Sequence, residues 1–192
     1  FLKSEATETA RIVEAVTHQA LARPEVAWEL RVDGRLALEA PACGSGPEGL
    51  RERATRLLLR EAGSGPAMRV LDLGTGLGHV ALAAAELVGR EGRVVGIDSS
   101  ARLLEVATGR ASALPQVQFV EGDVRTWKSD EPFDAIVGRL ILFHLPDAVA
   151  VLRHHLAALR PGGLVLALDF DLGAVRAEPP VPLCSQGIDW MN

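Results

Sequence analysis

Cysteine is scarce in this sequence, and the marks of membrane and secreted proteins are missing. The 192 residues include two cysteines, Cys43 and Cys184, which are too few for a disulfide framework or a metal cluster and are expected to be free thiols. No apolar run approaches the roughly 18 residues of a membrane span, and the N-terminus lacks a basic segment followed by an apolar one. The sequence therefore predicts a cytoplasmic protein with no membrane partner.

Concentrated positive charge and reactive clusters are also missing. Lys and Arg total 20 against 25 Asp and Glu, which gives a net charge of −5. Binding to a polyanion needs a dense patch of Lys and Arg, and none is visible, so nucleic acid is not an expected partner. No set of His, Cys and carboxylate residues has metal-ligand spacing, and no Ser or Cys lies in a nucleophile elbow. Small-molecule chemistry without a metal is favoured.

What is present is the composition of a globular protein, with 48% apolar and 23% charged residues. Two linkers rich in Gly, Pro and Ser, at residues 41–47 and 63–66, divide the chain. We expect four segments: a helix and β-hairpin appendage over 1–41, a linker and helix over 42–67, an α/β core over 68–172, and the start of a truncated substrate-side segment over 173–192.

The first segment begins with helical periodicity. Apolar residues recur at helical spacing from Ala6 to Leu21, after the candidate N-cap Ser4 and before Pro24, which ends the pattern. Alternation of apolar and polar residues then predicts a hairpin between residues 26 and 40, with an Asp-Gly turn.

The length of that turn decides the register of the hairpin. A two-residue loop would place Leu36 opposite Arg31, whereas a three-residue loop pairs Leu36 with Leu30 and Leu38 with Trp28. We predict the three-residue loop, with Gly34 left-handed.

The stretch FLKSEATETARIVEAVTHQALARPEVAWELRVDG resembles MutL-type DNA mismatch repair proteins, in which a helix leads from the ATPase domain into the next domain. The resemblance implies no ATPase activity here, because that family's catalytic carboxylate and phosphate-binding loops lie upstream of the matching segment. We interpret the segment as a scaffold, since function resides in sites rather than in folds.

From Met68 onward, short apolar runs alternate with helical stretches, which is typical of a doubly wound α/β fold with a parallel sheet. The predicted strands are 69–73, 93–97, 117–120, 133–137 and 164–168. The predicted helices are 78–88, 100–109 and 147–159, with a less regular crossover through 126–130. Pro161-Gly162-Gly163 is interpreted as the stop of the last helix.

The first of these strands runs into a glycine-rich turn, Gly74-x-Gly76-x-Gly78, and then into a helix. Glycines allow a tight turn and let backbone N–H groups approach a ligand at the positive end of a helix. His79 stands where a dinucleotide fingerprint has its third glycine, and Asp72 precedes the turn, so both residues argue against NAD.

Acidic residues follow the next two strands. Asp98 ends the second strand, where a carboxylate can accept hydrogen bonds from the two hydroxyls of a ribose. The alternative role for Asp98 is to cap the N-terminus of the following helix. Asp123 follows the third strand and can accept from an exocyclic amine, while Val124 can pack on a base; the alternative is a surface turn. After the fourth strand, an apolar loop over 138–146 opens at the same edge of the sheet, where open α/β sheets bind ligands.

Five motifs, in family order, resemble class I S-adenosylmethionine-dependent methyltransferases over about residues 50–171: VLDLGTGLGHVA, GRVVGIDSS, VQFVEGDV, FDAIVGRLILFHL and LRPGGLVLALDF. The resemblance implies S-adenosylmethionine as cofactor and methyl transfer to a small-molecule acceptor. It assigns cofactor binding to positions in the glycine turn and at the strand ends, namely Asp72, Gly74, Thr75, Gly76, Gly78, Asp98, Ser99, Asp123, Val124, Arg139 and Leu140.

The histidines offer one catalytic candidate. His144 follows the fourth strand on the binding edge and is the best general base, although a histidine there more often has a structural role. His154 and His155 lie inside the last predicted helix and are interpreted as structural. The loop after the fourth predicted strand also resembles that of bacterial enzymes of ubiquinone and menaquinone biosynthesis. Those enzymes usually carry paired histidines at the positions of Phe143 and His144.

The sequence departs from the family at its end. The family fold has seven strands, and the sixth and seventh are not found in the sequence, which would leave the fifth strand as an exposed edge. We therefore expect either that the N-terminal hairpin packs at that edge or that two chains share strands there as a homodimer. A nicotinamide-dependent oxidoreductase and a non-catalytic chimera or fragment stay open as alternatives.

Overall fold

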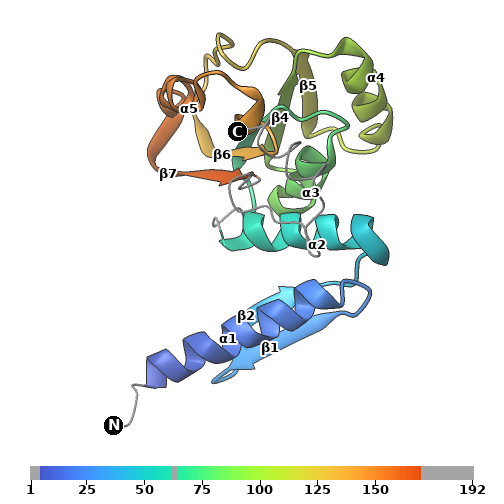
Figure 1. Cartoon of the computed structure of the whole chain (residues 1–192), viewed down its shortest axis with the longest axis vertical. Helices are drawn as coiled ribbons and strands as arrows, with labels where there is room; N and C mark the ends of the chain where they lie inside the picture. Colours follow the sequence, from blue (N-terminus) through green and yellow to red (C-terminus); the bar gives the residue numbers. More distant parts are fainter. Residues whose placement is uncertain (1–4, 62–64, 170–192) are drawn as a thin grey trace, which may run out of the picture.

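A parallel five-stranded sheet forms the centre of the C-terminal part of the molecule (Figure 1). The computed structural model describes residues 5–61 and 65–169. In chain order the sheet strands are β3 (Arg69–Leu73), β4 (Arg93–Asp98), β5 (Val117–Glu121), β6 (Phe133–Arg139) and β7 (Leu159–Leu168). Their order in space is β5-β4-β3-β6-β7, and every pair is parallel. The chain order reverses between β3 and β6, which is where ligands bind in such sheets.

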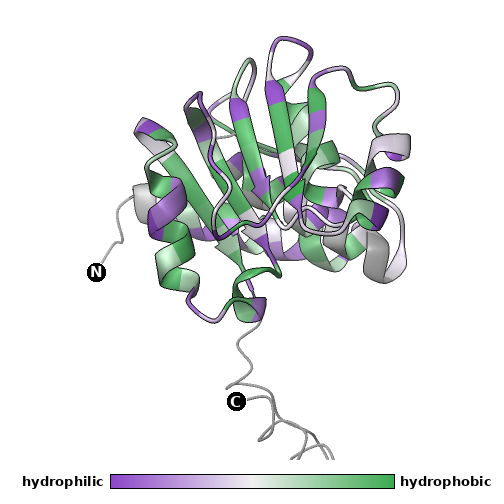
Figure 2. Ribbon diagram, turned by 90° about the horizontal axis from the view of Figure 1, so that it is seen from above, coloured by the Kyte–Doolittle hydropathy of each residue, from purple (hydrophilic) through white to green (hydrophobic). Residues whose placement is uncertain are grey.

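Side chains of the central strands alternate between two apolar cores, one on each face of the sheet. Val70 lies in a core with α3 (His79–Val88), whereas the adjacent Leu71 lies in the core that includes Val151 of α5 (Ala148–Leu156). Figure 2 shows the apolar strands between the flanking helices. The doubly wound α/β fold predicted from the sequence is therefore confirmed.

The last helix and the last strand differ from their predicted boundaries. The helix predicted to reach Leu159 ends at Leu156, and β7 begins at Leu159 and runs through Pro161-Gly162-Gly163. The interpretation of those three residues as the helix stop is wrong. They occupy a bulge instead, because Phe133 pairs with Leu159 while Ala135 pairs with Leu164. The crossover predicted over 126–130 contains no helix.

The hairpin has a shorter loop than predicted. Its strands are β1 (Trp28–Val32) and β2 (Arg35–Ala40), joined by Asp33 and Gly34, which have φ values of 50° and 75°. Two consecutive left-handed residues make the two-residue turn that suits the twist of a hairpin. The three-residue loop was therefore the wrong prediction, although Gly34 is left-handed. The register shifts between Leu30 and Arg31, because Leu30 pairs with Leu38 whereas Arg31 pairs with Leu36. Ala37 of β2 is therefore the extra residue of a bulge.

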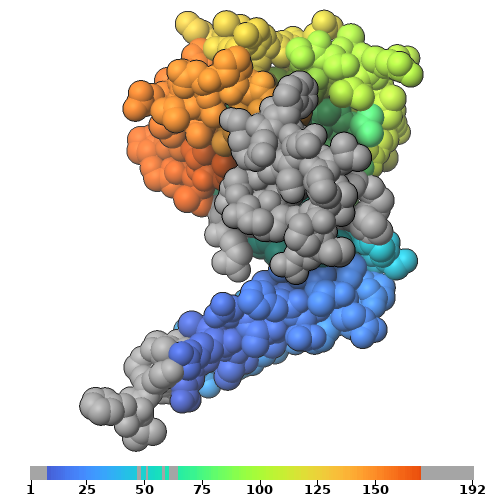
Figure 3. Space-filling view, in the orientation of Figure 1, coloured from blue at the N-terminus to red at the C-terminus, as the bar shows by residue number. Residues whose placement is uncertain are grey.

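The N-terminal unit packs against α2 (Gly46–Glu61) and not against β7. Helix α1 (Glu5–Ala22) and the hairpin share a small core with α2 that contains Ala20, Leu38, Ala40 and Leu57. Figures 1 and 3 show this unit beside α2, away from α5 and β7. The expectation that the hairpin covers the edge of the fifth sheet strand is wrong, because β1 and β2 form a separate two-stranded sheet.

The prediction that the sixth and seventh strands are missing is not borne out either. Counted along the chain, the described residues contain seven strands, and both β6 and β7 belong to the parallel sheet. The segment predicted over 173–192 lies outside the described residues, as does Cys184, while Cys43 is a free thiol.

One buried arginine joins the N-terminal unit to α2. The side chain of Arg53 is fully buried, and its guanidinium donates hydrogen bonds to four backbone carbonyls. The acceptors lie in the first 41 residues, at Ala20 (3.2 Å), Pro24 (2.8 Å), Val26 (2.8 Å) and Pro41 (2.8 Å). These carbonyls come from the end of α1 and from both ends of the hairpin, so one side chain fixes three parts of the chain.

Among the described residues, no helix is long and apolar enough to cross a membrane.

Candidate cofactor site

The glycine turn after β3 is built from left-handed residues. Gly74, Gly76 and Gly78 have φ values of 65°, 54° and 79°, a region that side-chain-bearing residues rarely adopt. A Cβ on Gly74 would lie 2.5 Å from Cδ1 of Ile141, whereas a Cβ on Gly76 would meet nothing within 4 Å. The backbone at Gly74 is thus covered closely by the loop after β6.

Replacing Gly74 with alanine is expected to destabilise the fold more than replacing Gly76. Both variants carry the left-handed strain of roughly 1–2 kcal/mol, but the Gly74 variant must also displace Ile141. Urea unfolding of Gly74→Ala and Gly76→Ala measures the difference. Equal free energies of unfolding in the two variants would contradict the close packing of Ile141 on the turn.

The buried side chain of Asp72 links the glycine turn to the first turn of α3 by hydrogen bonds. Its side chain is 1% exposed, and Oδ2 accepts hydrogen bonds from the Thr75 hydroxyl (2.6 Å) and from the backbone N–H of Ala81 (3.1 Å). Burial raises the pKa of Asp72 to about 7, although these hydrogen bonds and the charge of Arg139 oppose the rise. The polar groups of Asp72 and Thr75, which are both predicted to contact the cofactor, are thus hydrogen-bonded to each other.

The raised pKa of Asp72 predicts a pH dependence of stability. The folded state holds the proton more tightly than the unfolded chain, so this stabilisation is complete below about pH 4 and is lost as the pH rises through about 7. Between pH 5 and 8 the wild type is expected to lose roughly 2–3 kcal/mol more than Asp72→Asn, in which no proton titrates. Urea unfolding at both pH values measures this, and identical pH slopes would contradict it.

Asp98 connects the end of β4 with the glycine turn. Its Oδ2 accepts from the backbone N–H of Gly76 (2.9 Å), and its Oδ1 accepts from that of Ser100 (2.9 Å). The cap of α4 (Ala101–Arg110) is the Ser100 side chain, so Asp98 is not needed for that role. The carboxylate is half-buried and faces a pocket, which leaves it able to accept from further hydroxyl groups.

That pocket, called here the β4–β6 pocket, has a volume of about 270 Å³ and lies at the carboxyl ends of the strands. Ligand pockets of roughly 300–1,000 Å³ are typical, so this one lies just below that range. Its walls come from the ends of β3, β4 and β5 and from the loop after β6: Gly74, Asp98, Ser99, Gly122, Asp123, Val124, Arg125, Ile141, His144, Leu145 and Pro146. Five of the eleven predicted cofactor positions therefore line one pocket, namely Gly74, Asp98, Ser99, Asp123 and Val124.

The wall after β5 is held in place by α5. The backbone carbonyl of Val124 lies 2.7 Å from Nε2 of His155, and that of Trp127 lies 2.8 Å from Nε2 of His154. Both histidines thus have the structural role predicted for them. Desolvation lowers the pKa of His155, which favours the neutral ring. Asp123 is bound by Arg125, and this hydrogen bond lowers the pKa of its carboxyl to about 2.

Neither Arg139 nor Leu140 lines the β4–β6 pocket, whereas Ile141, which was not predicted, does. Arg139, expected over the cofactor, lines a different pocket between α2 and α3, and Leu140 has a left-handed φ of 57° and bonds through its N–H to the Leu168 carbonyl at 2.8 Å. Ile141 takes the covering position over Gly74. The sequence identifies the apolar loop over 138–146 but does not show which of its residues turns inward.

His144 lies on the rim of the β4–β6 pocket. It ends the short 3₁₀ helix η1 (Leu142–His144), is exposed, and has its ring centroid 3.8 Å from that of Phe143. Its ring can reach a molecule at the mouth of the pocket. No cluster of three or more His, Cys, Asp or Glu residues within 5–61 and 65–169 has the arrangement of a metal site.

These residues fit an adenosyl cofactor. The turn is open at Gly76, where a Cβ would meet nothing within 4 Å, so a ligand can lie against the backbone there. The Asp98 carboxylate has the position and spare acceptor capacity for vicinal hydroxyls. Beside it, the wall at Asp123 and Val124 offers an acidic and an apolar surface to a base.

Comparisons with known proteins agree with this geometry. Residues 64–186 match a family described as a methyltransferase domain. The chain is similar to trans-aconitate 2-methyltransferase of Azoarcus, at 41% identity over 60% of this chain and 44% of that protein, and to demethylmenaquinone methyltransferase of Staphylococcus epidermidis, at 31% identity over 62% and 47%.

Among solved structures, the fold is similar to that of a SAM-dependent methyltransferase from Aquifex aeolicus. The TM-score is 0.60 at 23% identity, over 70% of this chain and 73% of that chain. The chain spans a little under half the length of the two curated relatives it matches.

Proposed function

Because the chain belongs to the methyltransferase domain family, whose cofactor is S-adenosylmethionine, we propose that it binds this cofactor in the β4–β6 pocket and transfers the methyl group to a small-molecule acceptor. The observation that carries the proposal is the position of Asp98, which ends β4, bonds to the glycine turn and faces the pocket.

Seven of the predicted cofactor residues keep a role in this proposal. Gly74, Gly76 and Gly78 lie along the methionine and ribose side, and Asp98 with Ser99 binds the ribose hydroxyls. Asp123 and Val124 flank the adenine, for which Asp123 must share its carboxylate with Arg125. Leu140 was predicted to lie over the cofactor, and we assign that position to Ile141, whose side chain packs on the turn at Gly74.

S-adenosylmethionine supplies a methyl group on a sulfonium, which is an excellent leaving group. The protein therefore has mainly to position the acceptor in line with that group and to exclude water. Where the acceptor must lose a proton, we assign His144 as the general base, because its exposed ring lies at the mouth of the pocket.

The N-terminal unit is proposed as a scaffold, in keeping with its resemblance to a MutL segment. It packs on α2 through a separate core and contributes no residue to the β4–β6 pocket. The proposed domain division keeps residues 68–172 as the cofactor-binding core, with 1–41 as an appendage. A cytoplasmic location and acceptors other than nucleic acid are part of the same proposal, as is the alternative of a fragment that binds the cofactor without turnover.

Calorimetric titration tests the cofactor and the reaction class together. We expect S-adenosylmethionine and S-adenosylhomocysteine to bind the purified chain, and NAD not to bind. Release of S-adenosylhomocysteine with small-molecule acceptors would then establish transfer. Binding of NAD in place of the adenosyl ligands would favour an oxidoreductase, and binding without turnover would favour the fragment.

A further inference from the structure

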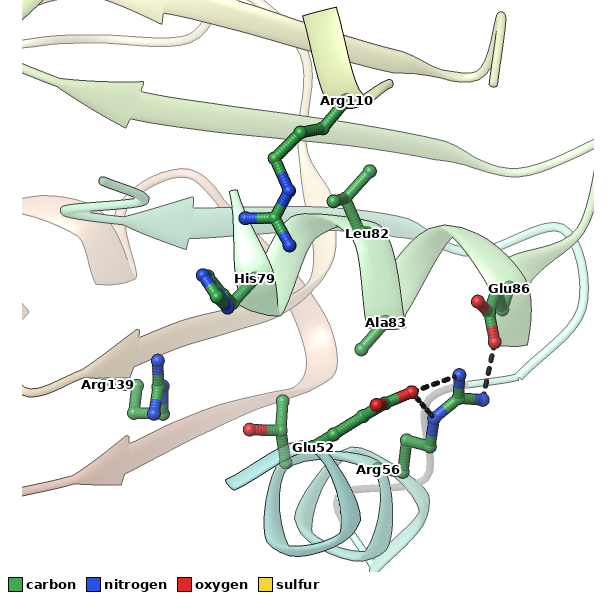
Figure 4. A pocket seen from close by; sticks show the side chains of 9 residues that line it. Glu52, Arg56, His79, Leu82, Ala83, Glu86, Arg110 and Arg139 are labelled. Atoms are coloured by element: carbon green, nitrogen blue, oxygen red, sulfur yellow. Dashed lines mark hydrogen bonds and ion pairs between the residues drawn. The ribbon is translucent and has the colours of Figure 1, made fainter. Parts of the chain in front are cut away.

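A second pocket lies between α2 and α3, beside the glycine turn (Figure 4). Its volume is about 340 Å³, and it is called here the α2–α3 pocket. Charged side chains from four elements line it: Glu52 and Arg56 from α2, Glu86 from α3, Arg110 from the end of α4 and Arg139 from the end of β6.

The charges of this pocket are divided between two sides. On the α2 side, Arg56 forms ion pairs with both Glu52 (2.9 Å) and Glu86, so these three charges are engaged with one another. On the opposite side, Figure 4 shows Arg110, His79 and Arg139 in a row. Arg110 donates one hydrogen bond, to the Leu77 carbonyl at 2.7 Å, which leaves its other donors available.

Arg139 brings a buried donor without a partner to the wall of this pocket. Its Nε is buried and has no hydrogen-bond partner in the part of the chain that the structure describes. A guanidinium with an unmatched buried donor is a strong site for a carboxylate, because the two form paired, charge-assisted hydrogen bonds.

The α2–α3 pocket is also in the right place for a reaction at the glycine turn. Arg139 follows Gly138, which pairs with Leu73, the residue before Gly74. His79 follows Gly78 directly and begins α3. The two pockets therefore border opposite ends of the same turn: Gly74 lines the β4–β6 pocket, and His79 lines the α2–α3 pocket.

We propose that the α2–α3 pocket binds the methyl acceptor and that the acceptor is a small organic acid with at least two carboxylates, held by Arg139 and Arg110. The inference rests on the proposed function. A carboxylate oxygen that accepts the methyl group has no proton to lose at neutral pH, so His144, which does not line this pocket, is not needed as a base here. The two guanidiniums come from different elements and are separated by His79, so they suit separate carboxylates better than a single compact anion.

The test is calorimetric binding of citrate to the complex of the chain with S-adenosylhomocysteine, with trimethyl citrate as the uncharged counterpart. We expect citrate to bind and the ester not to bind. Arg139→Gln and Arg110→Gln should each weaken citrate binding at least about tenfold. The matched control Arg153→Gln removes a charge from an exposed position on α5, outside the pocket, and should change it less than about threefold.

The same titrations separate failure of this inference from failure of the proposed function. Absence of S-adenosylhomocysteine binding to the wild type would contradict the proposed function itself. Normal binding of that ligand, with no citrate binding or with equal binding of citrate and its ester, would overturn the inference alone. The inference would also fail if Arg139→Gln weakened S-adenosylhomocysteine as much as citrate, because Arg139 would then hold the cofactor's own carboxylate. Arg110→Gln, altered at an exposed side chain, keeps the test valid if the Arg139 variant does not fold.

Discussion

Arg53→Met is expected to release the N-terminal helix and hairpin from α2 while the parallel sheet stays folded. The substitution keeps an apolar stem of similar length but leaves the carbonyls of Ala20, Pro24, Val26 and Pro41 without their donor. A buried acceptor without a partner costs about 1–3 kcal/mol, so the loss should be at least about 3 kcal/mol for this unit.

Hydrogen–deuterium exchange measures where that stability is lost. Amides of α1, β1 and β2 should exchange faster in Arg53→Met, and those of β3 and β4 should keep their protection. Arg56→Met is the matched control from the next turn of the same helix, since its ion pairs with Glu52 and Glu86 lie partly in solvent and are worth less than about 1 kcal/mol. Unchanged exchange in Arg53→Met, or equal loss in both variants, would contradict the role given to Arg53.

Asp98→Asn should abolish most of the affinity for S-adenosylmethionine without unfolding the domain. The amide oxygen can still accept one of the backbone hydrogen bonds from Gly76 and Ser100. It loses the negative charge that strengthens hydrogen bonds to two ribose hydroxyls, a loss of about 2–4 kcal/mol, which corresponds to roughly 30- to 1,000-fold weaker binding.

The matched control for this variant is Glu121→Gln. Glu121 pairs with Asp98 in the sheet register and carries the same charge, but it is exposed and does not line the β4–β6 pocket. Its affinity for S-adenosylmethionine should therefore change less than about threefold. Calorimetric titration measures the affinity of both variants for S-adenosylmethionine. An equal loss of affinity in the two would mean that Asp98 acts only through the overall charge of this edge of the sheet.

The sheet and the glycine turn could be predicted because their sequence signals are local. A parallel strand buried on both faces has a continuous apolar run, and β3 (Arg69–Leu73) has the predicted boundaries. Parallel strands also bring their carboxyl ends to one edge, so Asp98 and Asp123 could be expected near Gly74 from their order alone.

The errors concern features that depend on distant contacts. The three-residue loop was predicted because it pairs apolar residues across the hairpin. The structure has the two-residue Asp-Gly turn, and a bulge next to Leu30 still places Leu30 opposite Leu38. Arg53 has no local mark that distinguishes it from the other charged residues of α2, and only the fold shows its four carbonyl partners. The α2–α3 pocket was missed for the same reason, because four separate elements form it.

The most direct test of the central claim is an NMR map of amide shifts as S-adenosylhomocysteine is added to the labelled chain. The account predicts that the large shifts fall on Gly74, Gly76, Gly78, Asp98, Ser99, Asp123 and Val124, with α1 and the hairpin unchanged. Shifts confined to other parts of the fold, or no shifts at saturating ligand, would contradict a cofactor site at this edge of the sheet.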